Sequence, residues 1–375
     1  MKTRKSIPLT LEVLENRWCP AAVAMINSDG DLEITGTPTI VGGGVLGLRQ
    51  IAPGVWRFRD FPTPAQGPFV TSGNIIIDIP EASGRDFIGV DLNGNSMTNS
   101  LLVDIGAGDD TLTIFGGDTI AGDVIGIGVN QLEFGAVVDL VGNSVVMDAS
   151  RENIIGPSTY DLSGVEIGSN LVVLSGSSDD EIIMDSPVGG NVYLNLGNGF
   201  NTVTQPVSAP INGSFTYFGG SGDDEVFIEG VVGGSLYVNL GGGTNTLSLD
   251  VDSVIEGSLS AFGRSGDDEF STFEGVVENN VYINFGGGMN TVVSTGQVRG
   301  RFFGYFGGSG VDEVTLNGDA GDAFHFLSFG GDADILTIDT LAALSFLFAD
   351  MGAGVDTVDD FLSAFRFFPK RVLRV

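Results

Sequence analysis

The second half of the chain is built from short runs of alternating apolar and polar residues that recur at a constant interval. Each run follows a glycine-rich turn that ends in Asp or Asn, and successive turn residues stand 21 to 23 positions apart, with a mean of 22. These turn residues are Asp180, Asn201, Asp224, Asn245, Asp268, Asn290, Asp312, Asp334 and Asp356. A fixed period of this length is typical of solenoids, in which each repeat forms one coil stacked on the last.

The residues after each turn alternate as those of a half-buried β-strand do. The second residue after the turn position is apolar in all nine units: Ile182, Val203, Val226, Leu247, Phe270, Val292, Val314, Leu336 and Val358. The residue between the turn residue and this apolar residue is polar in every unit except one: Glu181, Thr202, Glu225, Thr246, Glu269, Thr291, Glu313 and Thr357. Successive side chains of a strand point to opposite faces. The pattern therefore predicts an inward apolar row and an outward, solvated row in which Glu alternates with Thr.

A second strand precedes each turn, in two alternating versions. One reads NVYLNL, SLYVNL or NVYINF, and the other reads SFTYF, SLSAF or RFFGYF. The true repeat is therefore about 44 residues long and contains two similar coils. A string of β-hairpins does not require so constant a period, whereas parallel coils must stack in register about 4.8 Å apart. We predict an all-β fold, a right-handed parallel β-helix with about 22 residues per coil in 44-residue double repeats.

Four segments are predicted along the chain. They are an export leader segment over 1–24, an irregular N-terminal cap over 25–80, the β-solenoid over 81–360 (most regular over 171–360), and a C-terminal cap with a basic tail over 361–375. Earlier turns at Asp86, Asp110 and Asn130 extend the solenoid to about 12 or 13 coils. Residues 131–177 keep strand-like runs but lose the register, so this is the segment in which a catalytic cleft is most readily placed.

The composition and charge narrow the possible partners. Gly accounts for 58 of 375 residues, yet 42% of residues are apolar, which is enough to build a core. The formal net charge is −32, and eight of the 16 basic residues lie in the first 23 and the last ten positions. Such a body repels nucleic acid and anionic membranes and attracts cations. Cys19 is the single cysteine, so no intramolecular disulfide forms. No run of 18 apolar residues exists, so we expect no membrane span.

The N-terminal segment LTLEVLENRWCPA resembles the LEPR-XLL-type segment found at the start of many bacterial exported and surface repeat proteins. The resemblance covers about 15 residues and implies export, and so a secreted or cell-surface location. A short amphipathic N-terminal helix is the alternative interpretation of the same residues.

The turns GGSGDDEV and GGSGVDEV fit the pattern Gly-Gly-x-Gly-x-Asp-x-aliphatic and resemble the nonapeptides of RTX, or hemolysin-type, calcium-binding β-rolls. In that family an Asp of one turn and carbonyl oxygens of the adjacent turn bind Ca²⁺. The resemblance implies a structural Ca²⁺ held by these aspartates: Asp110, Asp180, Asp224, Asp268, Asp312, Asp334 and Asp356.

This chain departs from the RTX pattern because most of its Asp turns alternate with Asn turns. Stacked Asn and Asp side chains can form a hydrogen-bonded ladder without a metal, so this alternative stays open at Asp180, Asp224 and Asp268. Asp312, Asp334 and Asp356 follow one another with no Asn between them. Carboxylates stacked about 5 Å apart repel one another, so this run needs a cation or protonation.

The sequence favours a non-catalytic protein. His325 is the single histidine and lies in an apolar run, and no phosphate-binding loop or nucleophile motif is present. The recurring tyrosines Tyr193, Tyr237 and Tyr282 are interpreted as stacked core or surface residues rather than a sugar site. We expect a structural or adhesive solenoid that binds Ca²⁺ and contacts cell-envelope or extracellular polysaccharide or protein. The alternative is a polysaccharide-active β-helix enzyme, a lyase or a hydrolase, with paired carboxylates in a groove within 131–177.

Overall fold

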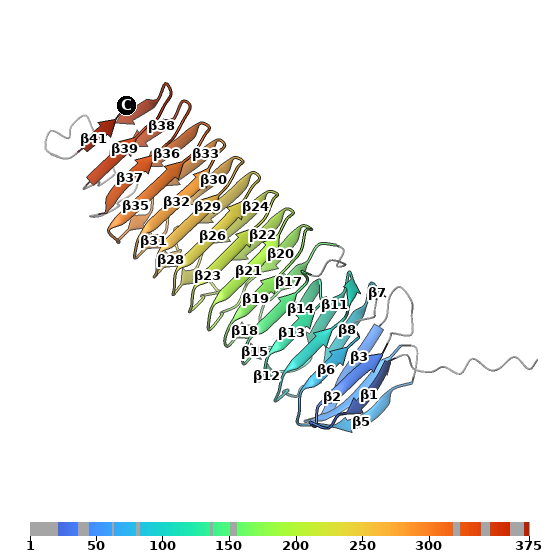
Figure 1. The fold of residues 1–375 in the computed structure, drawn as a ribbon. Helices are drawn as coiled ribbons and strands as arrows, with labels where there is room; N and C mark the ends of the chain where they lie inside the picture. The colour runs from blue at the N-terminus through green and yellow to red at the C-terminus, as the bar shows by residue number, and fades with distance from the viewer. Residues whose placement is uncertain are drawn as a thin grey trace, which may run out of the picture.

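The chain forms a long rod of stacked parallel coils (Figure 1). The computed structural model describes residues 22–36, 45–61, 64–79, 83–135, 138–150, 156–317, 323–338, 346–360 and 371–374. Every regular element within these ranges is a β-strand. Coils of about 22 residues stack over residues 75–359 in about 12 turns, so the predicted parallel β-helix and its period are confirmed.

Two 16-stranded sheets run the length of the rod. The parallel strands of the first, sheet A, are β6 (Ile75–Asp78), β9 (Leu101–Asp104), β13 (Val124–Ile127), β16 (Val145–Asp148), β19 (Leu171–Leu174), β21 (Val192–Gly197), β23 (Phe215–Gly219), β26 (Leu236–Gly241), β29 (Leu259–Gly263), β32 (Val281–Gly286), β35 (Phe302–Gly307), β37 (Phe324–Ser328), β39 (Phe346–Asp350) and β41 (Arg371–Arg374).

Sheet B receives the next strand of each coil, after the glycine-rich turn. Its parallel strands are β3 (Val45–Ala52), β8 (Phe87–Asp91), β11 (Thr111–Phe115), β14 (Gln131–Phe134), β17 (Thr159–Asp161), β20 (Asp180–Ile183), β22 (Asn201–Gln205), β24 (Asp224–Ile228), β27 (Asn245–Leu249), β30 (Asp268–Phe273), β33 (Asn290–Ser294), β36 (Asp312–Leu316), β38 (Ile335–Ile338) and β40 (Thr357–Asp360). One further parallel pair, β7 (Ser83–Gly84) with β10 (Ala107–Gly108), lies in the turn before β8 and β11.

A third, narrow side closes many coils. Its two-residue strands are β12 (Thr119–Ile120), β15 (Leu140–Val141), β18 (Glu166–Ile167), β25 (Val231–Val232), β28 (Val254–Ile255), β31 (Val276–Val277) and β34 (Gln297–Val298). Single bridges from Ile167 through Val188 and Ile211 to Val232 join its two parts. The sequence pattern predicts two strands per coil, so this third side is an addition to the predicted coil.

The N-terminal end differs from the rest of the rod because its strands are antiparallel. β1 (Ala22–Ile26) and β2 (Leu32–Gly36) pair antiparallel at the end of sheet A, and β2 is parallel to β6. β3, β4 (Val55–Asp60) and β5 (Gln66–Val70) form an antiparallel meander at the end of sheet B. Most of the predicted leader, residues 1–21, lies outside the described residues. Of the predicted C-terminal cap and basic tail over 361–375, only 371–374 are described, and they form β41, which pairs with β39 at the end of sheet A.

The coils keep their register through the segment in which the sequence pattern loses it. β14 pairs with β17 and β17 with β20, so Gln131, Thr159 and Glu181 stack on one another. β16 likewise pairs with β19. The described residues of 131–177 therefore continue the same parallel stack instead of interrupting it.

The interior is filled by the inward rows that the alternation predicts. Ile182, Val203, Val226, Leu247, Phe270, Val292, Val314 and Leu336 are at most 1% exposed, and Val358 packs against the same core. The outward residues between them stack as Glu181 on Thr202, Thr202 on Glu225 and Glu225 on Thr246. Alternating Glu with Thr separates like charges by about two coils, or ~10 Å, which weakens their repulsion.

Candidate metal site in the turn between the two sheets

All the predicted site residues lie in one column at the corner where the chain passes from sheet A to sheet B. The column also contains Asp86, Asn130, Ser158 and the three asparagines that alternate with aspartates between Asp180 and Asp312. Its members from Asp86 to Asp334 are between 0% and 3% exposed: Asp86, Asp110, Asn130, Ser158, Asp180, Asn201, Asp224, Asn245, Asp268, Asn290, Asp312 and Asp334. Asp356 follows at the C-terminal end and is only partly buried. We call this column the turn ladder.

The turn ladder is held together by hydrogen bonds between successive coils. The backbone N–H of one member donates to Oδ1 of the next, over 2.9 Å from Asp224 to Asn245, 2.9 Å from Asp312 to Asp334 and 3.1 Å from Asp334 to Asp356. Each Asn in the alternating part adds a second bond. Its Nδ2 donates to Oδ1 of the following Asp, over 2.8 Å from Asn201 to Asp224 and 2.9 Å from Asn290 to Asp312.

The second carboxylate oxygen of the ladder aspartates is left without a hydrogen bond among the described residues. This holds for Oδ2 of Asp110, Asp180, Asp224, Asp268, Asp312 and Asp334. Asp224 Oδ2 occupies the space that a Cβ on Gly219 would fill, and the carbonyl oxygen of Leu240 lies 2.6 Å from the same point. Gly307 has the same relation to Asp312 Oδ2 and to the carbonyl oxygen of Phe329. Two acceptor oxygens therefore lie beside the same glycine with no donor between them, so a proton on the carboxyl group is favourable.

Burial shifts these carboxyl groups toward the protonated form. Desolvation raises the pKa to about 7 for Asp110, Asp224 and Asp268 and to about 6 for Asp180 and Asp312, from an ordinary value of 3.8. Desolvation also raises the pKa of Asp334. Hydrogen bonds from Asn201, Asn245 and Asn290 oppose the shift at the Asp that each contacts. Near neutral pH a substantial share of the ladder carboxyl groups therefore holds a proton.

Two inward tyrosines that were not among the predicted site residues lie next to the turn ladder. Tyr217 and Tyr305 stand two residues before the glycines that border Asp224 and Asp312, and both side chains are fully buried. Burial, reinforced by the nearby Asp224 or Asp312 carboxylate, raises the pKa of each phenol far above its usual range. Each phenol lowers the pKa of the Asp that it faces, but neither makes a hydrogen bond within standard geometry among the described residues. Their position in SFTYF and FFGYF is the sequence signal for them.

The alternating part of the turn ladder does not fit Ca²⁺. The Nδ2 of each Asn is a donor placed against the next carboxylate, where a cation needs oxygen atoms, and Ca²⁺ takes six to eight of these. The described residues contain no group of three or more His, Cys, Asp or Glu side chains placed to hold a metal ion. Asp312, Asp334 and Asp356 fit better because no amide lies between them and the Oδ2 atoms of the first two are free of hydrogen bonds among the described residues.

The turn ladder is closed to large substrates because its carboxyl groups point into the core. A shallow hollow of about 420 Å³ beside β17 and β20 is lined by Asp179, Glu181 and Phe200, and also by Asp180 of the turn ladder. The Asp179 carboxylate accepts a hydrogen bond from the Phe200 backbone N–H over 2.8 Å. His325 is 1% exposed and stacks on Phe303, with 5.3 Å between ring centroids, so it belongs to the core.

Comparison with known proteins assigns neither a family nor a function to the chain. No family model, curated protein or solved structure matches the chain. Within the described residues no helix is long and apolar enough to cross a membrane.

Proposed function

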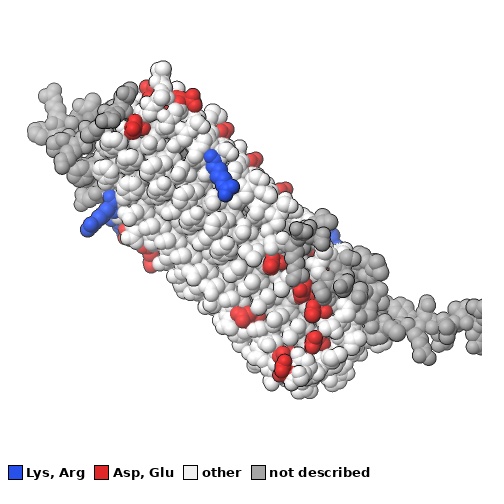
Figure 2. All heavy atoms as spheres, viewed as in Figure 1, with Lys and Arg blue, Asp and Glu red and all other residues white. Residues whose placement is uncertain are grey.

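We propose that the chain is a non-catalytic, secreted or cell-surface rod that adheres to other molecules through the outer face of sheet A. The observation that carries this proposal is that no outward residue of the sheet A strands from β19 to β37 is charged, within the described residues, in a chain whose formal net charge is −32. Figure 2 shows this broad surface without acidic side chains, which lie mainly along its margins, and with one basic side chain near its turn edge.

The same face carries a continuous row of aromatic rings, which we call the aromatic ladder. Neighbouring ring centroids are 4.9 to 5.8 Å apart from Tyr193 to Phe348. The members are Tyr193, Phe218, Tyr237, Phe262, Tyr282, Phe306, Phe326 and Phe348. All are partly exposed, and Tyr193 reaches 37%. Aromatic residues are enriched in the centres of binding interfaces and charged residues are depleted there.

The distribution of charge favours contact through this face over the others. Sheet B presents the Glu and Thr rows, and the turns add Asp179, Asp223 and Asp267. These acids repel an anionic surface at distances below about 10 Å. Sheet A lets a polymer without charge, such as a neutral cell-envelope polysaccharide, approach and stack on the rings.

Adhesion is tested by replacing the three tyrosines with threonine. Thr216 already occupies the register position of Tyr193 and Tyr237 on the neighbouring strand, so the triple variant Tyr193→Thr, Tyr237→Thr, Tyr282→Thr retains strand geometry. We expect wild type to sediment with insoluble cellulose or chitin and the variant to lose at least about tenfold in affinity. Thr202→Ser, Thr246→Ser, Thr291→Ser on sheet B is the matched control. Failure of wild type to bind any neutral polymer would contradict adhesion through this face.

The absence of catalysis is part of the proposal and has its own test. The evenly stacked coils and the inward direction of the ladder carboxyl groups support it. Incubation with acidic and neutral polysaccharides is expected to release no new reducing ends or unsaturated products. Product formation that Asp179→Asn or Glu181→Gln abolishes would instead favour the polysaccharide-active enzyme, with the hollow beside β20 as its site.

We also propose a structural Ca²⁺ at the C-terminal end of the turn ladder, held by the Asp312, Asp334 and Asp356 carboxylates together with turn carbonyl oxygens. Ca²⁺ would neutralise three consecutive carboxyl groups and so favour the stacked turns. We expect millimolar Ca²⁺, compared with EGTA or Mg²⁺, to raise the melting midpoint by a few degrees. The triple variant Asp312→Asn, Asp334→Asn, Asp356→Asn should lose this response. Equal midpoints in Ca²⁺ and EGTA would leave the turn ladder held by hydrogen bonds and protons.

A further inference from the structure

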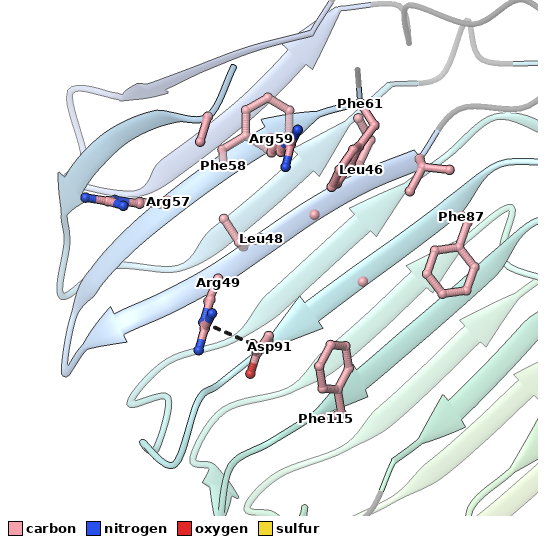
Figure 3. Close-up of a pocket in the computed structure, with 14 residues that line it drawn as sticks. Leu46, Leu48, Arg49, Arg57, Phe58, Arg59, Phe61, Phe87, Asp91 and Phe115 are labelled. Carbon is pink, nitrogen blue, oxygen red and sulfur yellow. Dashed lines mark ion pairs between the residues drawn. The ribbon is translucent and has the colours of Figure 1, made fainter. Parts of the chain in front are cut away.

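A cavity of about 470 Å³ opens on the outer face of sheet B near the N-terminal end of the rod (Figure 3). It is formed where the antiparallel meander of β3 and β4 meets the first parallel strands, β8 and β11. Pockets of this size, mostly apolar with a few placed polar groups, are typical of small-molecule sites. None of its side chains belongs to the turn ladder or to the aromatic ladder.

The floor of the cavity consists of two stacked glycines that the backbone does not require. Gly47 of β3 and Gly89 of β8 are register partners in the interior of their strands. Neither has a positive φ, and a Cβ would meet its nearest neighbour at an ordinary 3.5 Å at Gly47 and 3.6 Å at Gly89. Gly219, by contrast, has no room for a Cβ beside Asp224. Glycine within a strand weakens it and often marks a place where a ligand approaches closely.

Aromatic rings stand on both sides of this floor. A Cβ on Gly47 would lie 3.5 Å from the Phe61 ring, and one on Gly89 would lie 3.6 Å from the Phe87 ring and 3.7 Å from the Phe115 ring. The three phenylalanines are 37%, 41% and 37% exposed, respectively, although each is large and apolar. Exposed rings around a bare backbone floor form a slot suited to a flat ring, which can contact the Phe faces.

Positively charged side chains surround the slot, although the chain contains few basic residues. Arg49, Arg57 and Arg59 are three of only eight basic residues between positions 24 and 365. The Arg59 guanidinium lies 3.9 Å from the Phe61 ring centroid. Arg59 is also the cross-strand partner of Gly47. Arg49 and Arg57 are also cross-strand partners, an arrangement of like charges that is unfavourable without an anion nearby. In Figure 3 Arg57 lies farthest from the rings.

One acidic group balances part of this charge and adds hydrogen-bonding capacity. Asp91 Oδ2 is 3.2 Å from Arg49 Nε, and Arg49 also donates to Asn93 Oδ1 over 2.6 Å. The Arg49–Asp91 pair therefore presents both donors and an acceptor to a ligand in the slot. The lining of the cavity therefore contains three arginines and one aspartate.

We propose that this cavity binds a small ring-shaped molecule that carries a carboxylate, either a sugar acid or an aromatic acid. The ring lies on Gly47 and Gly89 between the phenylalanines, and the carboxylate pairs with Arg59, whose planar guanidinium matches carboxylate geometry. The acidic remainder of the rod keeps a long polyanion away, so the ligand is a small molecule or the end of a chain.

Glucuronate and benzoate test the two sources of this chemistry, with glucose and benzyl alcohol as uncharged counterparts. Titration of the full chain by calorimetry or NMR is expected to give a Kd of about 1 mM or tighter for at least one carboxylate. Its counterpart should bind at least about tenfold more weakly. Binding of glucuronate identifies a sugar acid and binding of benzoate an aromatic acid. Equal affinity for a carboxylate and its counterpart, or no binding of either carboxylate, would overturn the proposal.

Two variants locate the site, each with a matched control elsewhere. Gly89→Leu fills the slot without backbone strain and should abolish binding, whereas Thr246→Leu adds the same side chain to the outer face of sheet B at β27. Arg59→Gln should weaken carboxylate binding at least about tenfold, whereas Arg299→Gln removes an exposed arginine paired with Glu278 and should not. Circular dichroism confirms folding of each variant. Wild-type affinity in folded Gly89→Leu and Arg59→Gln would place the ligand elsewhere and overturn the proposal.

Discussion

In the buried carboxyl group of Asp224, one oxygen is hydrogen-bonded and the other is not. Its Oδ1 accepts hydrogen bonds from the Asn201 backbone N–H over 3.3 Å and from Asn201 Nδ2 over 2.8 Å. Its Oδ2 has no hydrogen bond among the described residues and faces the carbonyl oxygen of Leu240. An ionised carboxylate in this position loses its hydration without full compensation. An amide in the same place would keep the accepted bonds and add a donor for the carbonyl oxygen.

We predict that Asp224→Asn stabilises the protein at pH 8. The gain in the free energy of unfolding should be about 1 to 3 kcal/mol, the range for relieving an unsatisfied buried polar group. Denaturant unfolding measured at pH 8 checks this, with Asp223→Asn on the exposed neighbouring residue as the control. Two results together would mean that Asp224 holds a metal: the variant is clearly less stable than wild type, and Ca²⁺ stabilises wild type but not the variant.

At this scale the sequence located the ladder residues but not their surroundings. The 22-residue interval places Asp224 and Asn201 in one column because parallel coils must stack in register. The hydrogen bonds of each oxygen depend on the turn path, which the interval does not encode. The slot at Gly47 and Gly89 was also missed. Glycine inside the strand-like runs VLGLRQ and FIGVD was its only signal, since the residues that surround it come from separate strands.

The aromatic ladder is the element that joins successive strands on the outside of sheet A. Phe262 of β29 contacts Tyr237 and Tyr282 on the two neighbouring strands, with ring centroids 5.3 and 5.6 Å away. Such pairs contribute about 0.5 to 1.5 kcal/mol each beyond burial of area. Because every coil touches only its neighbours, the contribution stays local to three coils.

We predict that Phe262→Asn lowers the free energy of unfolding by about 1 to 3 kcal/mol, since two ring contacts are lost. Asn239 and Asn284 occupy the same register position on the adjacent strands, so the replacement suits the backbone. Guanidinium unfolding provides the measurement, and Ser260→Thr on the same strand serves as the control. An unchanged midpoint would mean that the rings contact one another without adding stability.

Strands of sheets A and B were predictable because each is long enough to show its alternation. The third side was not, because a strand such as Val254–Ile255 has one inward and one outward residue. Two residues contain no periodic signal. The alternation of shorter and longer intervals arises after the turn residue, on the way from sheet B to the next strand of sheet A. Phe215 stands 14 positions after Asn201, whereas Leu236 stands 12 positions after Asp224.

For the whole molecule, the buried carboxyl groups give stability an unusual dependence on pH. The folded-state pKa lies above the ordinary 3.8, at about 6 to 7, for Asp110, Asp180, Asp224, Asp268 and Asp312. Between pH values of about 4 and 7 the folded protein therefore binds more protons than the unfolded chain. The associated stability is therefore fully present below about pH 4 and is lost as the pH rises through 6 to 7.

We predict that in EGTA the melting midpoint is higher at pH 5 than at pH 8 by more than about 5 °C, because one pKa unit corresponds to about 1.4 kcal/mol. General charge repulsion also falls with pH, so the variant with all five aspartates changed to asparagine is the control. Its midpoint should vary much less with pH. A midpoint that falls on acidification would show that the ladder carboxyl groups are ionised in the folded protein.

The alternation of Asp and Asn in the turn ladder also restricts how such a chain can change in length. Duplicating or deleting one coil between Asp180 and Asp312 would bring two Asp turns or two Asn turns into contact. Two Asp turns in contact lack the Nδ2–Oδ1 bond and place two buried carboxyl groups side by side. Duplicating or deleting two coils together leaves every contact of the ladder unchanged. A gene for this rod can therefore grow or shrink by double coils at little cost to the fold, so related rods should differ in length by pairs of coils.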